Sequence, residues 1–250
     1  MAKLVIAALL AVLAGAAPAV GQQLTNAQRD AAIEFALNNT RHTMLHEIGH
    51  LLVDQLDLPV LGREEDAVDM LATLLMLNTG TEADVIGLQD TIDGWRYSES
   101  FRPSRGYVNS AFYGAHSLDI QRSYAMACLM VGSDYERHTQ YATRISLPID
   151  RQKSCAEDYR IAERGWSSVL EPHLREGAPA SDVTVQYRDT RGQYPIAQAL
   201  LEQSLVLETY ADWVAKNYVL PHPVQITAEN CGEVNAFYDL ESREVILCYE

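Results

Sequence analysis

The sequence predicts an α+β protein that is mainly α-helical, with a small β-sheet or hairpin at its C-terminal end. Between residues 25 and 218, most apolar residues recur at spacings of three and four, which is the period of a helix with one buried face. After residue 224, short runs rich in β-branched and aromatic residues alternate with turn residues, as in strands. The 250 residues, 48% of them hydrophobic, suffice for one domain with a substantial core.

Three helices are expected in the N-terminal part of the chain. The first begins at Thr25, because Thr25 and Gln28 have the spacing of a capping box, in which each side chain hydrogen-bonds the other residue's backbone N–H. The polar residues 38–40 either break this helix or cap the next one, whose apolar residues span 44–52. A loop then leads to a third helix at about residues 64–77.

The pattern of the following segment is less regular. Residues 80–115 contain scattered glycine, proline and aromatic residues, and we expect helices to resume only at residue 117. Near the C-terminus, residues 239–243 would be the turn between the last two strands. The remaining expected elements are helices at residues 117–130, 134–145, 155–174 and 196–218, and strands at residues 183–187, 224–227, 234–238 and 245–249.

The charge of the chain excludes some partners. The net charge is −15, and the sequence contains no run of lysine or arginine. A nucleic-acid-binding protein needs a basic face, and an anionic membrane surface attracts basic segments. We therefore expect neither nucleic acid nor an anionic membrane as a partner, and the acidity is explained by solubility.

The N-terminal segment has the layout of a secretory signal peptide. Lys3 precedes an apolar run at residues 4–14, and small residues then provide cleavage sites after Ala19 or Gly21. The alternative is an uncleaved anchor helix, but the apolar run is short for a bilayer span. We expect residues 1–21 to be a signal peptide, a periplasmic or secreted location, and no membrane span after cleavage.

The four cysteines are expected to form two disulfides. An even number of cysteines in an exported chain indicates disulfide bonding, because the compartment is oxidising. Pairing sequence neighbours joins Cys128 to Cys155 and Cys231 to Cys248, which is the simplest of the three connectivities. No Cys-x-x-Cys spacing occurs, so a structural zinc site on these cysteines is not expected.

The segment HEIGH at residues 46–50 carries the main chemical signal. On a helix, His46 and His50 lie four residues apart on one face, so both imidazoles can reach one metal ion. Glu47 lies beside them, where it can take a proton from a metal-bound water. This spacing is typical of zinc metallopeptidases, and the alternative is two helix histidines with ordinary hydrogen bonds.

A carboxylate of the next predicted helix is expected to complete the ligand set. Catalytic zinc takes three protein ligands and one water, and no third histidine follows His50 at the metzincin spacing. Glu65 and Asp69 resemble the Glu-x-x-x-Asp pattern of gluzincins, in which the Glu binds zinc and the Asp steadies a zinc-bound histidine. Glu64, Asp66 and Asp69 itself are the alternative ligands, and the cluster also complements the positive end of the helix dipole.

Several segments together resemble a family of bacterial zinc metallopeptidases known as a domain of unknown function. The string HEIGHLLVDQLDLPVLGREEDAVD, residues 46–69, carries the first part of the resemblance. Residues 116–122, 155–173, 231–239 and 248–250 carry the rest. The resemblance implies a mainly helical, zincin-like and gluzincin-like domain that binds Zn²⁺ and cleaves peptide bonds, without indicating a substrate.

His116 is a further candidate for the reaction. Gluzincins often use a distant His or Tyr to stabilise the oxyanion of the tetrahedral intermediate, and His116 precedes Ser117, a suitable helix N-cap. The alternatives are a role in positioning its loop or ordinary packing. Asp119 and Arg122 lie three residues apart on the same predicted helix and are expected to form a local ion pair.

The sequence therefore predicts that residues 22–250 form an exported zinc metallopeptidase domain acting on peptides or proteins. His46, His50 and Glu65 would hold zinc, Glu47 would activate the zinc-bound water, and Asp69 would support a ligand. One rival is a zinc hydrolase of non-peptide amides. A rival of another class is a non-catalytic envelope protein with a structural zinc site.

Overall fold

The computed structural model divides the chain into two compact units, Met1–Ile33 and Glu34–Glu250. In the first unit, the described residues are the beginning of helix α1 (Asn26–Gln55) and the residues before it from Leu24. The signal peptide expected at residues 1–21 lies outside the described residues. No helix of the described part has the length and apolar character needed to cross a membrane. The structure describes residues 24–101, 107–177, 179–188 and 192–250.

Helix α1 is continuous, although the sequence left undecided whether residues 38–40 break it. Its predicted capping box forms, since Thr25 N donates to Gln28 Oε1 at 2.9 Å and Gln28 N donates to Thr25 Oγ1 at 3.2 Å. Asn38 is buried without breaking the helix, because its side-chain Nδ2 donates to Asp90 Oδ2 at 2.7 Å. The polar side chain is thus satisfied by a tertiary contact rather than by a cap.

The segment expected to be irregular contains a long helix, α3 (Glu82–Ser100). Thr81 caps its start, where Thr81 Oγ1 accepts from Asp84 N at 3.1 Å. In the sequence, Gly94 suggests the end of a helix. In the structure, its lack of a side chain lets α3 approach α1 closely. A Cβ at Gly94 would lie 2.4 Å from Asn39 Oδ1 of α1. Tertiary packing therefore outweighs the low helix propensity of glycine.

Most of the other helices lie close to their predicted positions, but the short helix α4 (Ser110–Tyr113) lies in the segment that was expected to be irregular. The one expected at 196–218 is divided at Leu205, whose φ of 54° is left-handed and ends the first of two helices. The remaining helices are α2 (Glu64–Thr79), α4 (Ser110–Tyr113), α5 (Asp119–Ser133), α6 (Tyr135–Arg144), α7 (Ile149–Leu170), the short 3-10 helix η1 (Glu171–His173), α8 (Pro195–Ser204) and α9 (Val206–Asn217).

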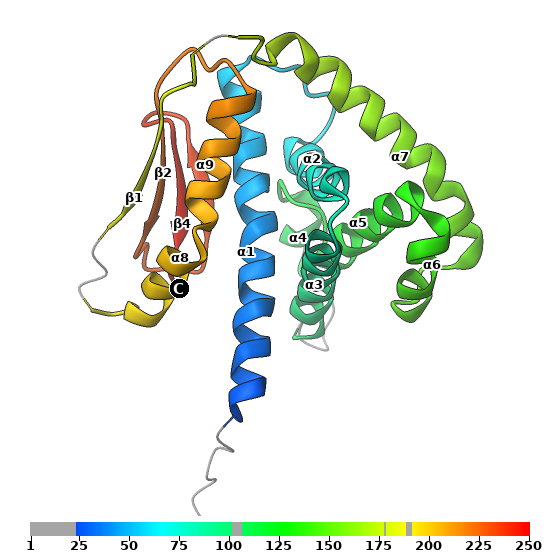
Figure 1. Cartoon of the computed structure of the whole chain (residues 1–250). Helices are drawn as coiled ribbons and strands as arrows, with labels where there is room; N and C mark the ends of the chain where they lie inside the picture. Colours follow the sequence, from blue (N-terminus) through cyan, green and yellow to red (C-terminus); the bar gives the residue numbers. More distant parts are fainter. Residues whose placement is uncertain (1–23, 102–106, 178, 189–191) are drawn as a thin grey trace, which may run out of the picture. The chain divides into compact units, whose positions relative to one another are not determined.

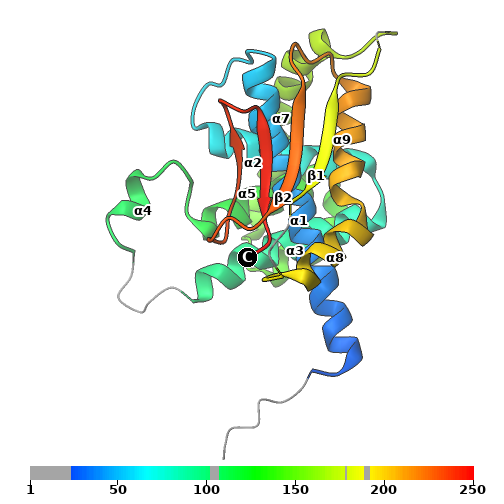
Figure 2. The same cartoon turned by 90° about the vertical axis from the view of Figure 1, so that its left-hand side faces the viewer.

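The C-terminal part forms a four-stranded sheet, as Figure 2 shows. The strand order is β1-β2-β4-β3, with β1 parallel to β2, β2 parallel to β4, and β3 antiparallel to β4. The expected hairpin is thus present as β3 and β4, and two parallel strands extend it. Strand β3 lies at one edge of the sheet. The strands are β1 (Val183–Tyr187), β2 (Val224–Glu229), β3 (Ala236–Asp239) and β4 (Glu244–Cys248).

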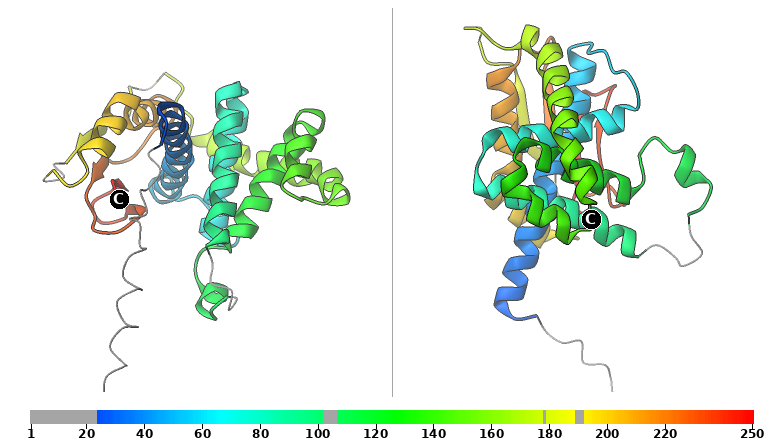
Figure 3. Two further views of the ribbon diagram at one scale, coloured as in Figure 1. Left: turned by 90° about the horizontal axis from the view of Figure 1, so that it is seen from below. Right: turned by 90° about the vertical axis from the view of Figure 1, so that its right-hand side faces the viewer.

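Helix α1 contributes to two separate cores. Met44 and Ile48 belong to a core with Leu207 of α9 and Ile226 of β2. Leu45 belongs to a second core shared with α2, α3, α5 and α6. In Figures 1 and 3, α1 accordingly lies between the sheet with α8 and α9 on one side and the helices α3, α5 and α6 on the other. Burial on opposite faces fixes the position of this helix more firmly than one apolar stripe would.

Both expected disulfides are present. Cys128 of α5 is bonded to Cys155 of α7, and Cys231 is bonded to Cys248 of β4. The sequence separations are 27 and 17 residues. The first bond is buried within the second core, and the other ties the segment before β3 to the last strand. The predicted connectivity is therefore confirmed.

Removing the first disulfide should destabilise the protein. In the double variant Cys128→Ala/Cys155→Ala, urea denaturation should show a free energy of unfolding lower by about 2–4 kcal/mol, because the unfolded chain gains freedom. Reduced wild-type protein provides the control and should lose stability in the same direction. An unchanged unfolding free energy, or free thiols in non-reducing peptide maps of the exported protein, would contradict this assignment.

Candidate metal centre

A close crossing of two helices builds the site. His46 and His50 lie one turn apart on α1, and their ring centroids are 5.0 Å apart. Gly49 lies between them and faces Val68 of α2. A Cβ at Gly49 would lie 2.7 Å from the Val68 Cβ, so only glycine permits this approach. The crossing brings the acidic start of α2, which includes Glu65, against the two histidines.

Glu65 is the carboxylate on which the histidines converge. Its Oε2 lies 3.2 Å from His46 Nε2 and 3.4 Å from His50 Nε2. Burial opposes the charge of Glu65, but hydrogen bonds from His116, His46 and His50 outweigh it and hold its pKa far below the usual value. Glu65 is thus an ionised carboxylate, and its oxygen could bind a metal ion together with the two imidazole nitrogens. The structure places it where the sequence predicts the third ligand.

The other ring nitrogens of both histidines are hydrogen-bonded to carboxylates. His46 Nδ1 donates to Asp69 Oδ1 at 2.7 Å, as expected for a supporting residue. His50 Nδ1 donates to Glu64 Oε1 at 2.7 Å. Glu64, an alternative ligand from the sequence, thus contacts the Nδ1 side of the His50 ring. With both Nδ1 atoms engaged, the Nε2 atoms, which both lie beside Glu65 Oε2, are the nitrogens that could bind a metal.

The carboxylates also favour a positive charge at His46. Burial lowers the pKa of this imidazole, but hydrogen bonds to Asp69 and Glu65 outweigh burial and raise the pKa to about 9. The pKa of His50 is raised as well, because its hydrogen bonds to Glu65 and Glu64 outweigh its burial. A metal ion at the Nε2 atoms would supply the same positive charge in place of the protons.

Asp69 is itself held by a buried arginine. Arg122 Nε donates to Asp69 Oδ2 at 2.6 Å, and its terminal nitrogen donates to Asp69 Oδ1 at 2.7 Å. The guanidinium carbon lies 3.6 Å from the centroid of the Trp95 ring. The expected local pair of Arg122 with Asp119 is therefore wrong, and Asp119 accepts a hydrogen bond from Ser98.

The contacts of Arg122 keep Asp69 ionised. Burial of Asp69 favours the neutral acid, but hydrogen bonds from His46 and Arg122 hold its pKa below the usual range. A short ion pair was expected because Asp119 is close in sequence. The true partner of Arg122 lies 53 residues away, and no local pattern signals it.

His116 brings a third imidazole to the same carboxylate. Its Nε2 lies 2.9 Å from Glu65 Oε2, and its ring is stacked at 6.4 Å from that of His46. One donor atom each from His46, Glu65 and His116 lie within 4.8 Å of one another, so these residues could also share a metal. The His116 side chain is 55% exposed, whereas that of His46 is 7% exposed.

Glu47 lies in the cleft beside these donors and is buried. Burial raises its pKa, and the charge of Glu65 adds to the rise. His46, His50 and a hydrogen bond from the Tyr238 backbone act in the opposite direction without cancelling it. A carboxylate with a raised pKa is suited to taking and returning a proton near neutral pH.

The cleft itself has a volume of about 550 Å³ and lies between the helix crossing and the edge strand β3. It brings together every predicted catalytic or ligand residue, although they come from three distant segments. Asp66 lines a different cavity. No sequence pattern indicated that β3 borders the site. The lining residues are His46, Glu47, His50, Arg63, Glu64, Glu65, Ala115, His116, Asn235, Ala236, Phe237, Tyr238 and Leu240.

Comparison with known proteins identifies a family for this chain. The sequence profile of a family described as "Putative metallopeptidase" matches residues 13–170 and 187–250. The chain belongs to this family. No curated protein and no solved structure matches the chain significantly. The description of this metallopeptidase family implies a metal, and the cluster of His46, Glu65 and His116 offers donors for one.

The helix crossing can be tested at Gly49. Gly49→Ala places a methyl group against Val68, so α2 must move away, with a stability loss of roughly 1–3 kcal/mol. The displacement of Glu65 and Asp69 should weaken metal binding at least about tenfold. Thermal denaturation and competition with a chelator measure the two effects.

Gly165→Ala in α7 is the matched control, because nothing lies within 4 Å of the added Cβ. This variant should retain the metal affinity and gain a little stability. Equal metal affinity in both alanine variants would show that the Gly49 contact does not position the ligands.

The role of Asp69 can be tested by Asp69→Asn. This change removes the charged acceptor of His46 Nδ1, and metal affinity should fall roughly 10- to 100-fold. Asp66→Asn, on the same helix but outside the cleft, should change little. Because Asp69→Asn leaves Arg122 buried without its partner, a second variant adds Arg122→Met to remove both charges. Wild-type affinity in a folded form of either Asp69 variant would rule out the supporting role.

Proposed function

We propose that this protein is an exported zinc-dependent metallopeptidase that hydrolyses peptide bonds in peptides or proteins. The observation that carries the proposal is the convergence of His46 Nε2 and His50 Nε2 on Glu65 Oε2 beside the buried Glu47. Membership of the metallopeptidase family supports it.

The donor set fits zinc. Two imidazole nitrogens and one carboxylate oxygen form a common catalytic zinc set, which leaves a fourth position for water or substrate. We assign His46, His50 and Glu65 as ligands, because the two histidines are fixed on α1 by two cores. His116 is more exposed and lies outside the described helices, so we assign it another role. When bound, zinc lowers the pKa of its water to near 7 and polarises the substrate carbonyl.

Glu47 is assigned as the proton carrier. Its carboxylate accepts the proton of the attacking water and passes it to the nitrogen of the leaving amine. Burial raises its pKa, which favours its transient protonated form. His116, which also lines the cleft, is assigned to the carbonyl oxygen of the substrate, to which its Nε2–H would donate as negative charge develops there.

The edge strand β3 offers a place for the substrate backbone. Its other edge pairs with β4, and its residues Ala236, Phe237 and Tyr238 line the cleft. An extended peptide could add to this edge through main-chain hydrogen bonds, which suits a peptide better than a small amide. Substrate selection would then depend on the side-chain pockets on either side of the metal.

Export is supported by two observations. The N-terminal residues have the layout of a signal peptide, and two disulfides join all four cysteines. Disulfides persist in oxidising compartments, so we place the protein in the periplasm or outside the cell.

The variant Glu47→Gln tests the function. Purified protein should bind about one zinc ion per chain. Glu47→Gln should keep the zinc while its turnover of a fluorogenic peptide library falls by roughly 10²- to 10⁴-fold, because only the proton carrier is lost. Glu163→Gln, at an exposed position of α7, is the matched control and should leave both unchanged.

The outcomes separate the alternatives. Absence of zinc after reconstitution would exclude the metal assignment. Zinc without peptide turnover in the wild type would point to a structural site, and turnover of non-peptide amides alone would point to another hydrolase. Undiminished turnover in Glu47→Gln would exclude Glu47 as the proton carrier.

A further inference from the structure

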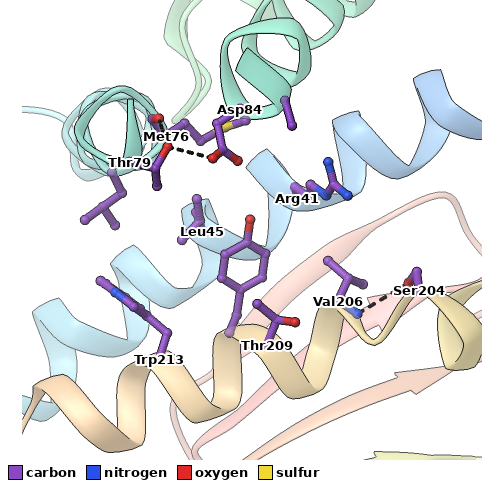
Figure 4. A pocket seen from close by; sticks show the side chains of 12 residues that line it. Arg41, Leu45, Met76, Thr79, Asp84, Ser204, Val206, Thr209 and Trp213 are labelled. Carbon is purple, nitrogen blue, oxygen red and sulfur yellow. Dashed lines mark hydrogen bonds between the residues drawn. The ribbon is translucent and has the colours of Figure 1, made fainter. Parts of the chain in front are cut away.

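A second cavity, away from the metal cleft, has the features of a ligand site. It lies between α1, α2, α3 and α9, as Figure 4 shows, and its volume is about 370 Å³. Small-molecule sites usually span about 300–1,000 Å³, so this cavity suits a ligand of amino-acid size. No residue lines both this cavity and the metal cleft.

The walls of the cavity are mainly apolar. Leu45 comes from α1, Met76 from α2, and Val206 and Trp213 from α9. The Trp213 side chain points toward the cavity from the α9 wall in Figure 4. These groups would bury an aliphatic or thioether side chain, and the indole offers a flat surface for it.

Two opposite charges also face the cavity without neutralising each other. Arg41 and Asp84 both line it, but in the described part of the chain no salt bridge joins either group to another residue. Arg41 donates one terminal N–H to Asn38 Oδ1 at 2.9 Å, and its other N–H groups have no partner among the described residues. Asp84 Oδ2 accepts from Thr79 and Thr81, which leaves Oδ1 available.

Tyr210 brings a third polar group, its hydroxyl, to the cavity that Arg41 and Asp84 line. Tyr210 lines the cavity and makes no hydrogen bond within the described residues. Burial raises its pKa to about 12, Asp84 adds to the rise, and Arg41 opposes it. The charges of Arg41 and Asp84 thus act in opposite directions on this hydroxyl, and all three groups line the same cavity.

We propose that this cavity binds a free apolar α-amino acid. Its carboxylate would pair with Arg41 and its ammonium group with Asp84 Oδ1, while its side chain would lie against Met76 and Trp213. A purely apolar ligand would leave the two charges and the Tyr210 hydroxyl unpaired, which is costly when water is displaced. A zwitterion satisfies both charges and matches the apolar walls.

Ligand titration tests the proposal on the full exported chain. L-leucine or L-methionine should bind one per chain with a Kd of about 0.1–1 mM, measured by calorimetry and by the change in tryptophan fluorescence. N-acetyl-L-leucine lacks the ammonium group and L-leucinol lacks the carboxylate, so each should bind roughly 10- to 100-fold more weakly. Glycine, which lacks the apolar side chain, should also bind weakly. The affinity should be the same with and without added zinc, which separates this site from amino-acid binding to a metal.

Variants locate the binding. Arg41→Met and Asp84→Asn should each weaken L-leucine binding by a similar factor, whereas Arg164→Met, at an exposed position of α7, should not. Trp213→Phe should remove the fluorescence change and keep most of the heat of binding. The proposal is overturned if no saturable binding occurs up to about 10 mM, a concentration well above the expected Kd. It is equally overturned if N-acetyl-L-leucine or L-leucinol binds as tightly as L-leucine, or if Arg41→Met and Asp84→Asn both bind normally. The ligand series needs no substitution, so it decides the matter even if a variant fails to fold.

Discussion

The contact between Gly49 and Val68 determines the geometry of the whole cleft. Because a Cβ at Gly49 would collide with Val68, the backbones of α1 and α2 can cross at this point only with glycine. The crossing falls between His46 and His50. Glu65 and Asp69, one turn apart on α2, are thereby brought against the histidines from the opposite side. If these residues hold a metal ion, as proposed, a displacement of even 1 Å would weaken its binding, because the donor atoms would no longer converge on one point.

The rest of the fold keeps this crossing rigid and electrostatically balanced. Burial of α1 in two cores prevents the helix from shifting toward either side. On the side of His46 away from Glu65, His46, Asp69 and Arg122 form a buried chain of charged hydrogen bonds that ends on the Trp95 ring. A buried carboxylate without such partners would be protonated or destabilising, so Arg122 allows Asp69 to remain a charged acceptor for His46.

Local patterns predicted much of the molecule. The capping box, most helix positions, strand β1 and both disulfides agree with the structure, because each depends on residues close in sequence or on simple pairing rules. The long helix α3 was missed, since Gly94 resembles a helix breaker until its contact with Asn39 is seen. The parallel pairing of β1 with β2 and of β2 with β4 was also missed, because such pairing joins strands that are separated by other elements.

The residue types of the candidate site and their spacing along two helices could be read from the sequence alone. His46 and His50 are four residues apart, so the period of a helix places them on one face, with Glu47 directly beside His46 in the sequence. The Glu-x-x-x-Asp spacing likewise indicated Glu65 and Asp69. The contacts of Glu64 with His50, of Arg122 with Asp69, and of β3 with the cleft became known only from the folded structure. These contacts join residues 14 to about 190 positions apart, and side-chain spacing along one helix or strand carries no information about which distant segment packs against it.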